Sequence, residues 1–247
     1  MTRRTLLILA LALLISAHAS SARAYLLPAY KITAEQRAVP AEETLAHYEQ
    51  QLAQIRSQVS LTILADRHRD YKARVQPHKR AALASYDELQ EPLAFWRWVV
   101  DLKKHLVALQ GSEPPAKAVD EADDMAKMIV QRIYDISQEY RVAFTALFQN
   151  FMMNMGAHKR GYCYQYVEDL LKTLTQRQWR FYELRWGKAW ADSWLENNAL
   201  VITAKGAPFK SGLAVDSWRS AGKPFWTPVK GDSYPWKEIV EKNTAAE

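Results

Sequence analysis

The residue best suited to chemistry is Cys163, the only cysteine of the chain, which stands at the start of a predicted helix. An apolar stripe at three- and four-residue steps indicates this helix; it consists of Val167, Leu170, Leu171 and Leu174. A helix N-terminus presents unpaired N–H groups and about half a positive charge. The basic residues 158–160 directly precede it. These surroundings favour the thiolate, so the sequence predicts a setting suited to a nucleophile.

A cysteine nucleophile is normally activated by a neighbouring base, most often a histidine. No histidine follows Cys163 in the sequence, and the nearest upstream is His158. His68 and His78 lie among charged residues, without an acidic or thiol partner at metal-ligand spacing. The sequence therefore predicts no metal site and indicates no cofactor.

The residues before Cys163 have a helical period. An apolar stripe predicts a helix over 41–59 that packs on its own domain. Residues 66–91 are charged and interrupted by a proline, and Pro92 suits the first position of a following helix. A long helix is predicted over 117–150, with the acidic cluster at 120–124 as its solvated start.

After the Cys163 helix the period changes to two. Residues 181–188 alternate like a two-sided strand, and 198–203 are β-branched enough for a buried strand. A short strand is expected over 212–218, and 225–229 should be an edge strand because it contains Pro228. The predicted fold class is α+β, with a helical N-terminal half packed on a helix and a small antiparallel sheet.

The first 24 residues have the pattern of a signal peptide. Arg3 and Arg4 precede the apolar run 6–15, which is too short for a membrane span, and Ala22-Arg23-Ala24 fits a cleavage site. The sequence thus predicts export across the inner membrane, with a periplasmic chain from Tyr25 that has no stable membrane span. The alternative is an uncleaved N-terminal anchor.

Charge and cysteine usage narrow the class of protein. The formal charge of +6 includes three arginines and no acid within the first 24 residues, which leaves +3 after cleavage. That is not the charge of a nucleic-acid binder. A single cysteine excludes an internal disulfide. The remaining chain divides into a helical region, 25–155, and an α+β region, 156–247, which together can form one domain.

Four blocks in the second half carry a resemblance to a known fold. They are Arg160-Gly-Tyr-Cys-Tyr164, Glu196-Asn-Asn-Ala-Leu-Val201, Gly212-Leu-Ala-Val-Asp-Ser-Trp-Arg219 and Asp232-Ser-Tyr-Pro-Trp236. These blocks resemble those of a poorly characterised group of exported bacterial proteins with a papain-like (transglutaminase-like, NlpC/P60-like) cysteine-hydrolase fold. In that group the second block normally begins Glu-His-Asn, and the third contains Leu-Asp-Pro-Trp-Arg.

The resemblance implies a site in which a thiolate attacks a carbonyl carbon, a histidine moves the proton and an acid orients the histidine. Carried over, Cys163 is the nucleophile position, Asn197 the base position and Asp216 the orienting position. Asparagine cannot take up a proton near neutral pH, so the chain departs from the pattern at its base. The candidate cleft residues are His158, Tyr162, Tyr164 and Trp218.

Three interpretations remain open from the sequence. The domain can be catalytically degenerate and bind a protein or peptide partner in the cell envelope. It can be an active cysteine hydrolase or acyltransferase whose base is His158 or Asp216. Alternatively, the resemblance misleads, and Cys163 is a small buried residue of an α+β binding domain, with Asp216 in a structural ion pair with Arg219.

Overall fold

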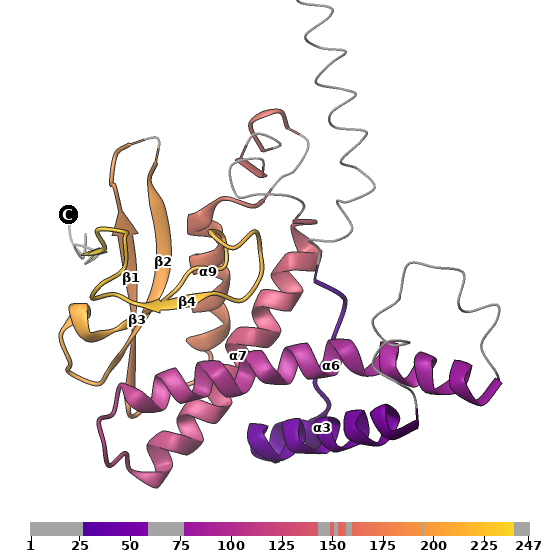
Figure 1. Cartoon of the computed structure of the whole chain (residues 1–247). Helices are drawn as coiled ribbons and strands as arrows, with labels where there is room; N and C mark the ends of the chain where they lie inside the picture. Colours follow the sequence, from indigo (N-terminus) through magenta and orange to yellow (C-terminus); the bar gives the residue numbers. More distant parts are fainter. Residues whose placement is uncertain are drawn as a thin grey trace, which may run out of the picture. The chain divides into compact units, whose positions relative to one another are not determined.

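The computed structural model describes residues 27–58, 77–142, 149–150, 153–156, 160–193 and 195–239. The predicted signal peptide and His158 lie outside these residues. The fold is α+β, as predicted, with helices and a five-stranded antiparallel sheet (Figure 1). The chain divides into two units: residues 30–131, and the parts of the chain on either side of them. The division falls inside a helix, whereas the sequence suggested a boundary at 155.

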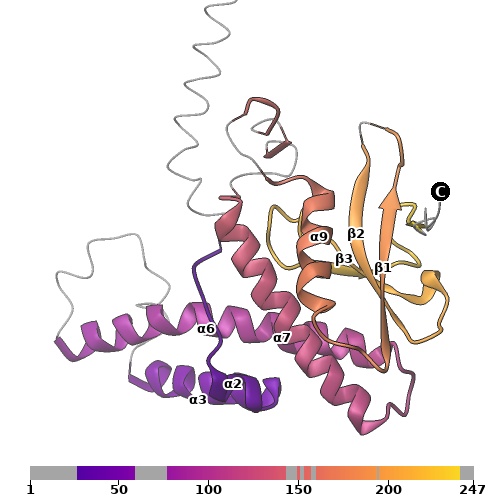
Figure 2. The same cartoon turned by 180° about the vertical axis from the view of Figure 1, so that it is seen from behind.

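The unit of residues 30–131 is helical. Its elements are α2 (Ala34–Ala38), α3 (Ala41–Gln58), α6 (Pro77–Ala108) and the first part of α7 (Ala116–Glu139). Helices α3 and α6 lie side by side (Figures 1 and 2). The stripe predicted for 41–59 is confirmed over the described residues, because Leu52 and Ile55 pack with Leu89 and Leu93 of α6. No helix within the described ranges is both long and apolar enough to cross a membrane.

Helix α6 differs from its prediction, because it begins at Pro77 and continues through Pro92. A proline inside a helix removes one backbone hydrogen bond and costs about 3 kcal/mol. The apolar face offsets this cost, since Ala82 and Leu89 before Pro92 are buried in the same cluster as Leu93 after it. Packing therefore overrides the local signal for a helix start.

Helix α7 also differs, because it ends at Glu139 and not at 150. Arg141 has a φ of 50°, Arg141 N–H donates to the Gln138 carbonyl, and Val142 N–H donates to the Ser137 carbonyl. This is a Schellman ending with a left-handed residue after the helix, usually a glycine. Because this position holds Arg141 and not a glycine, the sequence did not indicate that the helix ends here.

The acidic cluster at the start of α7 is not fully solvated as predicted. Asp123 is buried, and its carboxylate lies 2.6 Å from Lys127 Nζ and 2.9 Å from Lys103 Nζ. It also accepts a hydrogen bond from Ala41 N–H at 3.0 Å, and Lys127 donates to the Val39 carbonyl. The buried charges thus hold the chain that leads into α3 against α7.

The second unit contains helix α9 (Cys163–Leu174) and the sheet. The strands are β1 (Tyr182–Ala189), β2 (Asn197–Ala204), β3 (Leu213–Val215), β4 (Trp226–Pro228) and β5 (Lys237–Ile239), in the order β4-β3-β2-β1-β5. Helix α9 and the first four strands were predicted, and β4 is an edge strand as expected. Strand β5, the other edge, was missed because its three residues carry two charges and no β-branched run.

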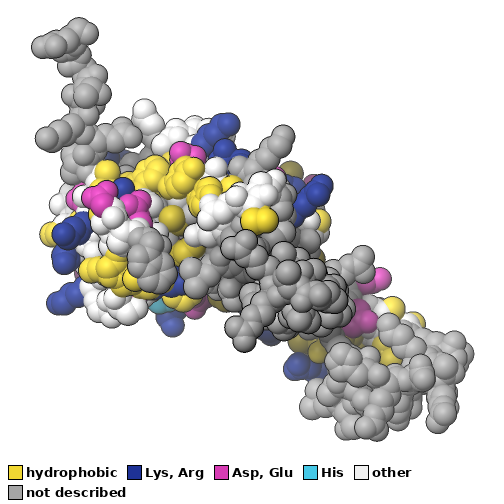
Figure 3. Space-filling view, turned by 90° about the horizontal axis from the view of Figure 1, so that it is seen from above, with side chains coloured by type: hydrophobic (Ala, Val, Ile, Leu, Met, Phe, Trp, Pro, Cys, Tyr) yellow, Lys and Arg dark blue, Asp and Glu magenta, His cyan; other side chains and the backbone are white. Residues whose placement is uncertain are grey.

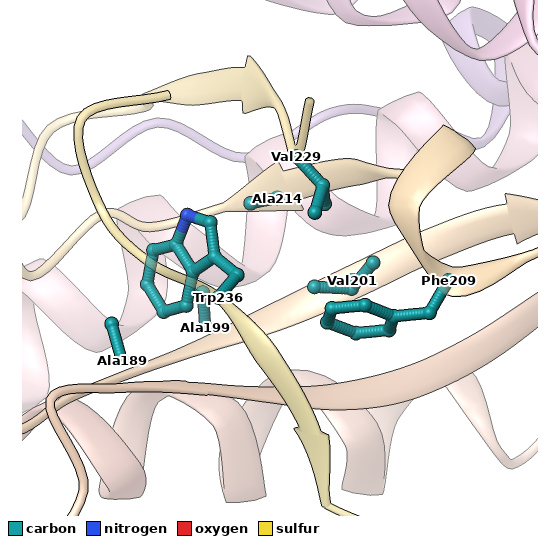
Figure 4. Close-up of a cluster of buried hydrophobic side chains, with 7 residues drawn as sticks. All are labelled: Ala189, Ala199, Val201, Phe209, Ala214, Val229 and Trp236. Atoms are coloured by element: carbon teal, nitrogen blue, oxygen red, sulfur yellow. The ribbon is translucent and has the colours of Figure 1, made fainter. Parts of the chain in front are cut away.

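The two faces of the sheet have different partners. Ala199, Val201 and Ala214 face a cluster completed by Trp236 and other apolar residues (Figure 4). The alternate residues of β2 face α9, which packs on this strand. Strand β2 is consequently buried on both faces and paired on both edges.

Strands β1 and β2 pack closely at Gly187, and a substitution there can test this contact. A Cβ at this position would lie 2.8 Å from Val201 Cγ2 and 3.3 Å from Phe209 Cζ. We expect Gly187→Ala to lower the free energy of unfolding by about 1–3 kcal/mol, because the extra methyl overfills this contact. Urea unfolding of the full chain measures the change. Val201→Ala should relieve part of it, so a double-mutant cycle that is additive within about 0.5 kcal/mol would contradict the packing.

Candidate functional site

Cys163 is the first residue of α9, and its sulfur faces the start of β2. Asn198 Nδ2 donates to Cys163 Sγ at 3.5 Å, and the thiol points to the Glu196 carbonyl oxygen at 3.8 Å. Only 8% of Cys163 is exposed. The sulfur is therefore packed between a helix N-terminus and two residues that flank Asn197.

The start of α9 is fixed by side chains from the helix itself and from α7. Gln165 Oε1 accepts hydrogen bonds from Gly161 N–H at 2.6 Å and Tyr162 N–H at 3.1 Å. One turn later, Asp169 Oδ2 accepts from Tyr140 at 2.6 Å and lies 3.0 Å from Arg132. These bonds set the orientation of the first turn and hence the position of the thiol.

Burial raises the pKa of the Cys163 thiol. Hydrogen bonds from Asn198 and from backbone N–H groups oppose this shift, and the Asp216 carboxylate adds to it. The predicted shift towards thiolate is therefore wrong. The helix N-terminus is present as expected, but desolvation of the sulfur outweighs it.

Asn197 has other partners. Its amide Nδ2 donates to Asp216 Oδ2 at 2.7 Å, and its Oδ1 accepts from Asn198 N–H at 2.9 Å. Successive side chains of a strand point to opposite faces, so Asn197 belongs to the face of the Trp236 cluster and Asn198 to the α9 face. The residue of β2 that contacts the sulfur is thus Asn198, one residue beyond the base position implied by the resemblance.

Asp216 is buried and surrounded by donors. Arg219 N–H donates to Oδ1 at 3.2 Å, and Arg219 Nε lies 3.1 Å from Oδ2. Burial raises the pKa of Asp216 to about 6, although the Arg219 charge and the Asn197 amide act in the opposite direction. The ion pair with Arg219, considered from the sequence as a structural alternative, is present.

Arg219 joins the third and fourth sequence blocks. Its guanidinium makes two hydrogen bonds of 3.0 Å to Asp232, which also accepts from Trp236 Nε1 at 2.7 Å. The guanidinium stacks on the rings of Phe225 and Tyr234, with its carbon 4.6 Å and 4.0 Å from their centres. The third and fourth blocks are thus joined by one partly buried cluster around Arg219.

The other candidate cleft residues have different surroundings. Trp218 is buried, and its Nε1 has no hydrogen-bond partner among the described residues. Tyr162 and Tyr164 stack at 5.9 Å, with 10° between their planes, and Tyr164 is 40% exposed. His158 lies outside the described residues, so the structure does not place it relative to Cys163.

A pocket of about 520 Å³ lies beside α9 on the same face of the sheet as Asn198. We name it the α9–β1 pocket. It is lined by Tyr164, Leu171, Trp186, Lys188, Glu196, Asn198 and Ile239. Seen towards the N-terminal end of α9, hydrophobic side chains reach the surface next to acidic and basic ones (Figure 3).

Sequence reasoning identified only Tyr164 among these lining residues as a cleft candidate. The alternating pattern of residues 181–188 placed Trp186 and Lys188 on the same face of the predicted strand. It did not indicate that this face is only partly covered. Trp186 Nε1 donates to Asn198 Oδ1 at 2.7 Å, and Lys188 Nζ lies 3.2 Å from Glu196 Oε1. The polar groups of the pocket are thus held in place and adjoin the residue that contacts the thiol.

No group of three or more His, Cys, Asp or Glu side chains in the described part of the chain is arranged to hold a metal ion. No protein-family model matches the sequence, and comparisons with curated proteins and with solved structures give no significant match. The site is therefore interpreted from its own geometry.

The raised pKa of Asp216 predicts a pH-dependent stability. The pKa of a carboxyl group in the unfolded chain is near 4, and that of Asp216 in the folded protein is about 6. At a pH between these two pKa values, the folded protein keeps a proton that the unfolded chain has lost. This contribution is complete below about 4 and disappears as the pH rises through about 6. We expect the free energy of unfolding of the wild type to fall by up to about 2–3 kcal/mol between pH 4 and 7 because of this group. Asp216→Asn should not show this decrease, and urea unfolding at each pH measures it.

The matched control is Asp192→Asn, which changes an exposed carboxylate in the turn that follows β1. It should leave the pH profile of the wild type unchanged. A wild-type profile that is parallel to that of Asp216→Asn over this range would contradict the raised pKa.

Proposed function

We propose that the sheet-containing unit is a non-catalytic binding domain built on a papain-like plan, exported by residues 1–24 to act on a protein or peptide in the cell envelope. The observation that carries the proposal is the contact of Cys163 Sγ with the Asn198 amide at 3.5 Å. An amide donates a hydrogen bond to sulfur but cannot remove its proton near neutral pH. Within the described part of the chain, the sulfur contacts this amide and the Glu196 carbonyl, and neither group activates a nucleophile.

The neighbouring amide supports the same proposal. Asn197 and Asp216 form a hydrogen bond of 2.7 Å, which resembles the contact between a base and its orienting acid. With asparagine in place of histidine, this pair positions an amide and transfers no proton. Because Asn197 belongs to the face of β2 opposite to the sulfur, this pair supplies no base to Cys163.

The competing proposal is a cysteine hydrolase or acyltransferase with an unusual base. Asp216 is a weak candidate for that base, because it is buried and already surrounded by Arg219 and Asn197. Burial of the sulfur acts in the same direction, since it favours the neutral thiol. Both features favour binding over catalysis.

The first test is the pH dependence of Cys163 alkylation by iodoacetamide in the chain from Tyr25. We expect a midpoint above the free-thiol value of about 8.5, because burial disfavours the thiolate. The native protein should also react more slowly than the same protein in urea. Cys163→Ala gives the background, since the chain has one cysteine.

A midpoint below about 7, with faster alkylation of the native than of the unfolded chain, would contradict the proposal. It would show a stabilised thiolate, and the cysteine hydrolase would become the better function. Hydrolysis of any peptide or amide that is lost in Cys163→Ala would have the same meaning.

A histidine substitution tests which asparagine faces the sulfur. We expect Asn198→His to place an imidazole at the position of the amide that contacts Cys163 and to raise the alkylation rate at pH 7 by about tenfold or more. Asn197→His, on the opposite face of β2, should change the rate less than about twofold. Thermal unfolding controls for folding of both variants.

The reverse result, with a faster reaction in Asn197→His alone, would place residue 197 against the sulfur. In that case the base position implied by the family resemblance would be correct, and the contact of Asn198 would not define the site.

A further inference from the structure

We propose that the α9–β1 pocket and the edge of β5 that no other described strand pairs with bind an extended peptide that carries an aromatic or aliphatic residue two positions from an acidic residue. This inference rests on the proposed binding function and specifies its ligand. It follows from the shape of the pocket, from the strand beside it and from the charges next to it.

The pocket is lined by α9 from Tyr164 to Leu171. Tyr164 and Leu171 line it from the helix and are seven residues apart, so they lie on one side of α9, about 10 Å from each other. An extended chain rises about 3.3 Å per residue, so about three residues span this distance. A volume of about 520 Å³ falls within the range of ligand sites.

An edge strand forms the outer side of the pocket. Strand β5 pairs with β1 and is the last strand in the sheet order, and its Ile239 lines the pocket. An edge strand directs alternate N–H and C=O groups outward, where an extended peptide can pair with them. A ligand that fills the pocket and also pairs with the outward N–H and C=O groups of β5 needs a peptide backbone.

The charges beside the pocket favour an acidic ligand. Lys188 and Lys237 are directly opposite each other in the β1–β5 register and so lie on the same face. Like charges in this arrangement are destabilising. Glu196, 3.2 Å from Lys188, is the carboxylate of the pocket, and Glu238 lies on the other face, bonded to Arg185. An additional carboxylate from a ligand would offset the remaining positive charge.

The register of β1 and β5 specifies the spacing within the peptide. Ile239 is opposite Trp186, and Lys237 is opposite Lys188, two residues along the strands. A peptide strand added to β5 directs every second side chain to this face. One side chain therefore meets the apolar pair, and the side chain two positions away meets the lysines.

The test uses the chain from Tyr25 and fluorescently labelled heptapeptides of threonine, capped at both ends, with Phe and Glu two positions apart. Both orders are needed, because the added strand can run in either direction. We expect at least one peptide to bind with a Kd below about 1 mM, measured by fluorescence anisotropy. Replacing Glu by Lys in that peptide should weaken binding by about fivefold or more.

Two variants of the protein give the matched comparison. Lys237→Glu reverses a charge beside the pocket and should weaken binding of the Phe–Glu peptide by about fivefold or more. Lys210→Glu makes the same change on the 3₁₀ helix Phe209–Ser211, outside the pocket, and should change the Kd by less than about twofold. A peptide N-methylated at alternate residues should not bind, because it cannot pair with β5.

Three results would overturn the inference: no binding by either peptide at about 1 mM, equal binding of the Glu and Lys peptides, or full binding of the N-methylated peptide. Mass spectrometry of the bound peptide separates this inference from the proposed function. Cleavage that depends on Cys163 would refute the non-catalytic function while binding at the pocket stands. Absence of binding refutes the inference alone, since the alkylation test decides the function.

Discussion

The arrangement of the second unit depends on one strand, β2, which is covered by α9 on one face and by the Trp236 cluster on the other. Because side chains alternate along a strand, neighbouring residues at its start enter different environments. Asn198 reaches the sulfur of Cys163, while Asn197 reaches the buried carboxylate of Asp216. The thiol site and the ion-pair cluster are therefore separate constructions on the two sides of the same strand.

At the Cys163 site, the helix N-terminus and the burial of the sulfur have opposite effects on the thiol pKa. A helix N-terminus lowers a thiol pKa when the sulfur is accessible to charge and water. Here desolvation is larger, and the pKa rises. For Asp216, the adjacent Arg219 does not fully compensate burial either. Arg219 is shared with Asp232, which takes both of its terminal nitrogens, so its charge is divided between two carboxylates.

Residue pattern predicted the α+β class, α9 and four strands, because α9 has an apolar stripe at helical spacing and the strands have short alternating or β-branched runs. It failed where tertiary contacts decide, as when α6 continues through Pro92 because Leu89 and Leu93 share one buried cluster. The sequence indicated that Cys163 begins a helix. It could not show that the sulfur meets Asn198, because a difference of one residue in strand register exchanges the two faces. The α9–β1 pocket was unpredictable for a related reason, since it depends on how far α9 covers the sheet.

The burial of β2 on both faces has a consequence for measurements on this protein. A strand that is paired on both edges and covered on both sides exposes its amides only when the whole unit opens, so its slowest amide hydrogens report the global free energy of unfolding. A ligand that binds only the folded unit adds its binding free energy to that opening. Hydrogen exchange at Leu200 or Val201 thus provides a measure of ligand affinity from residues that line no part of the pocket.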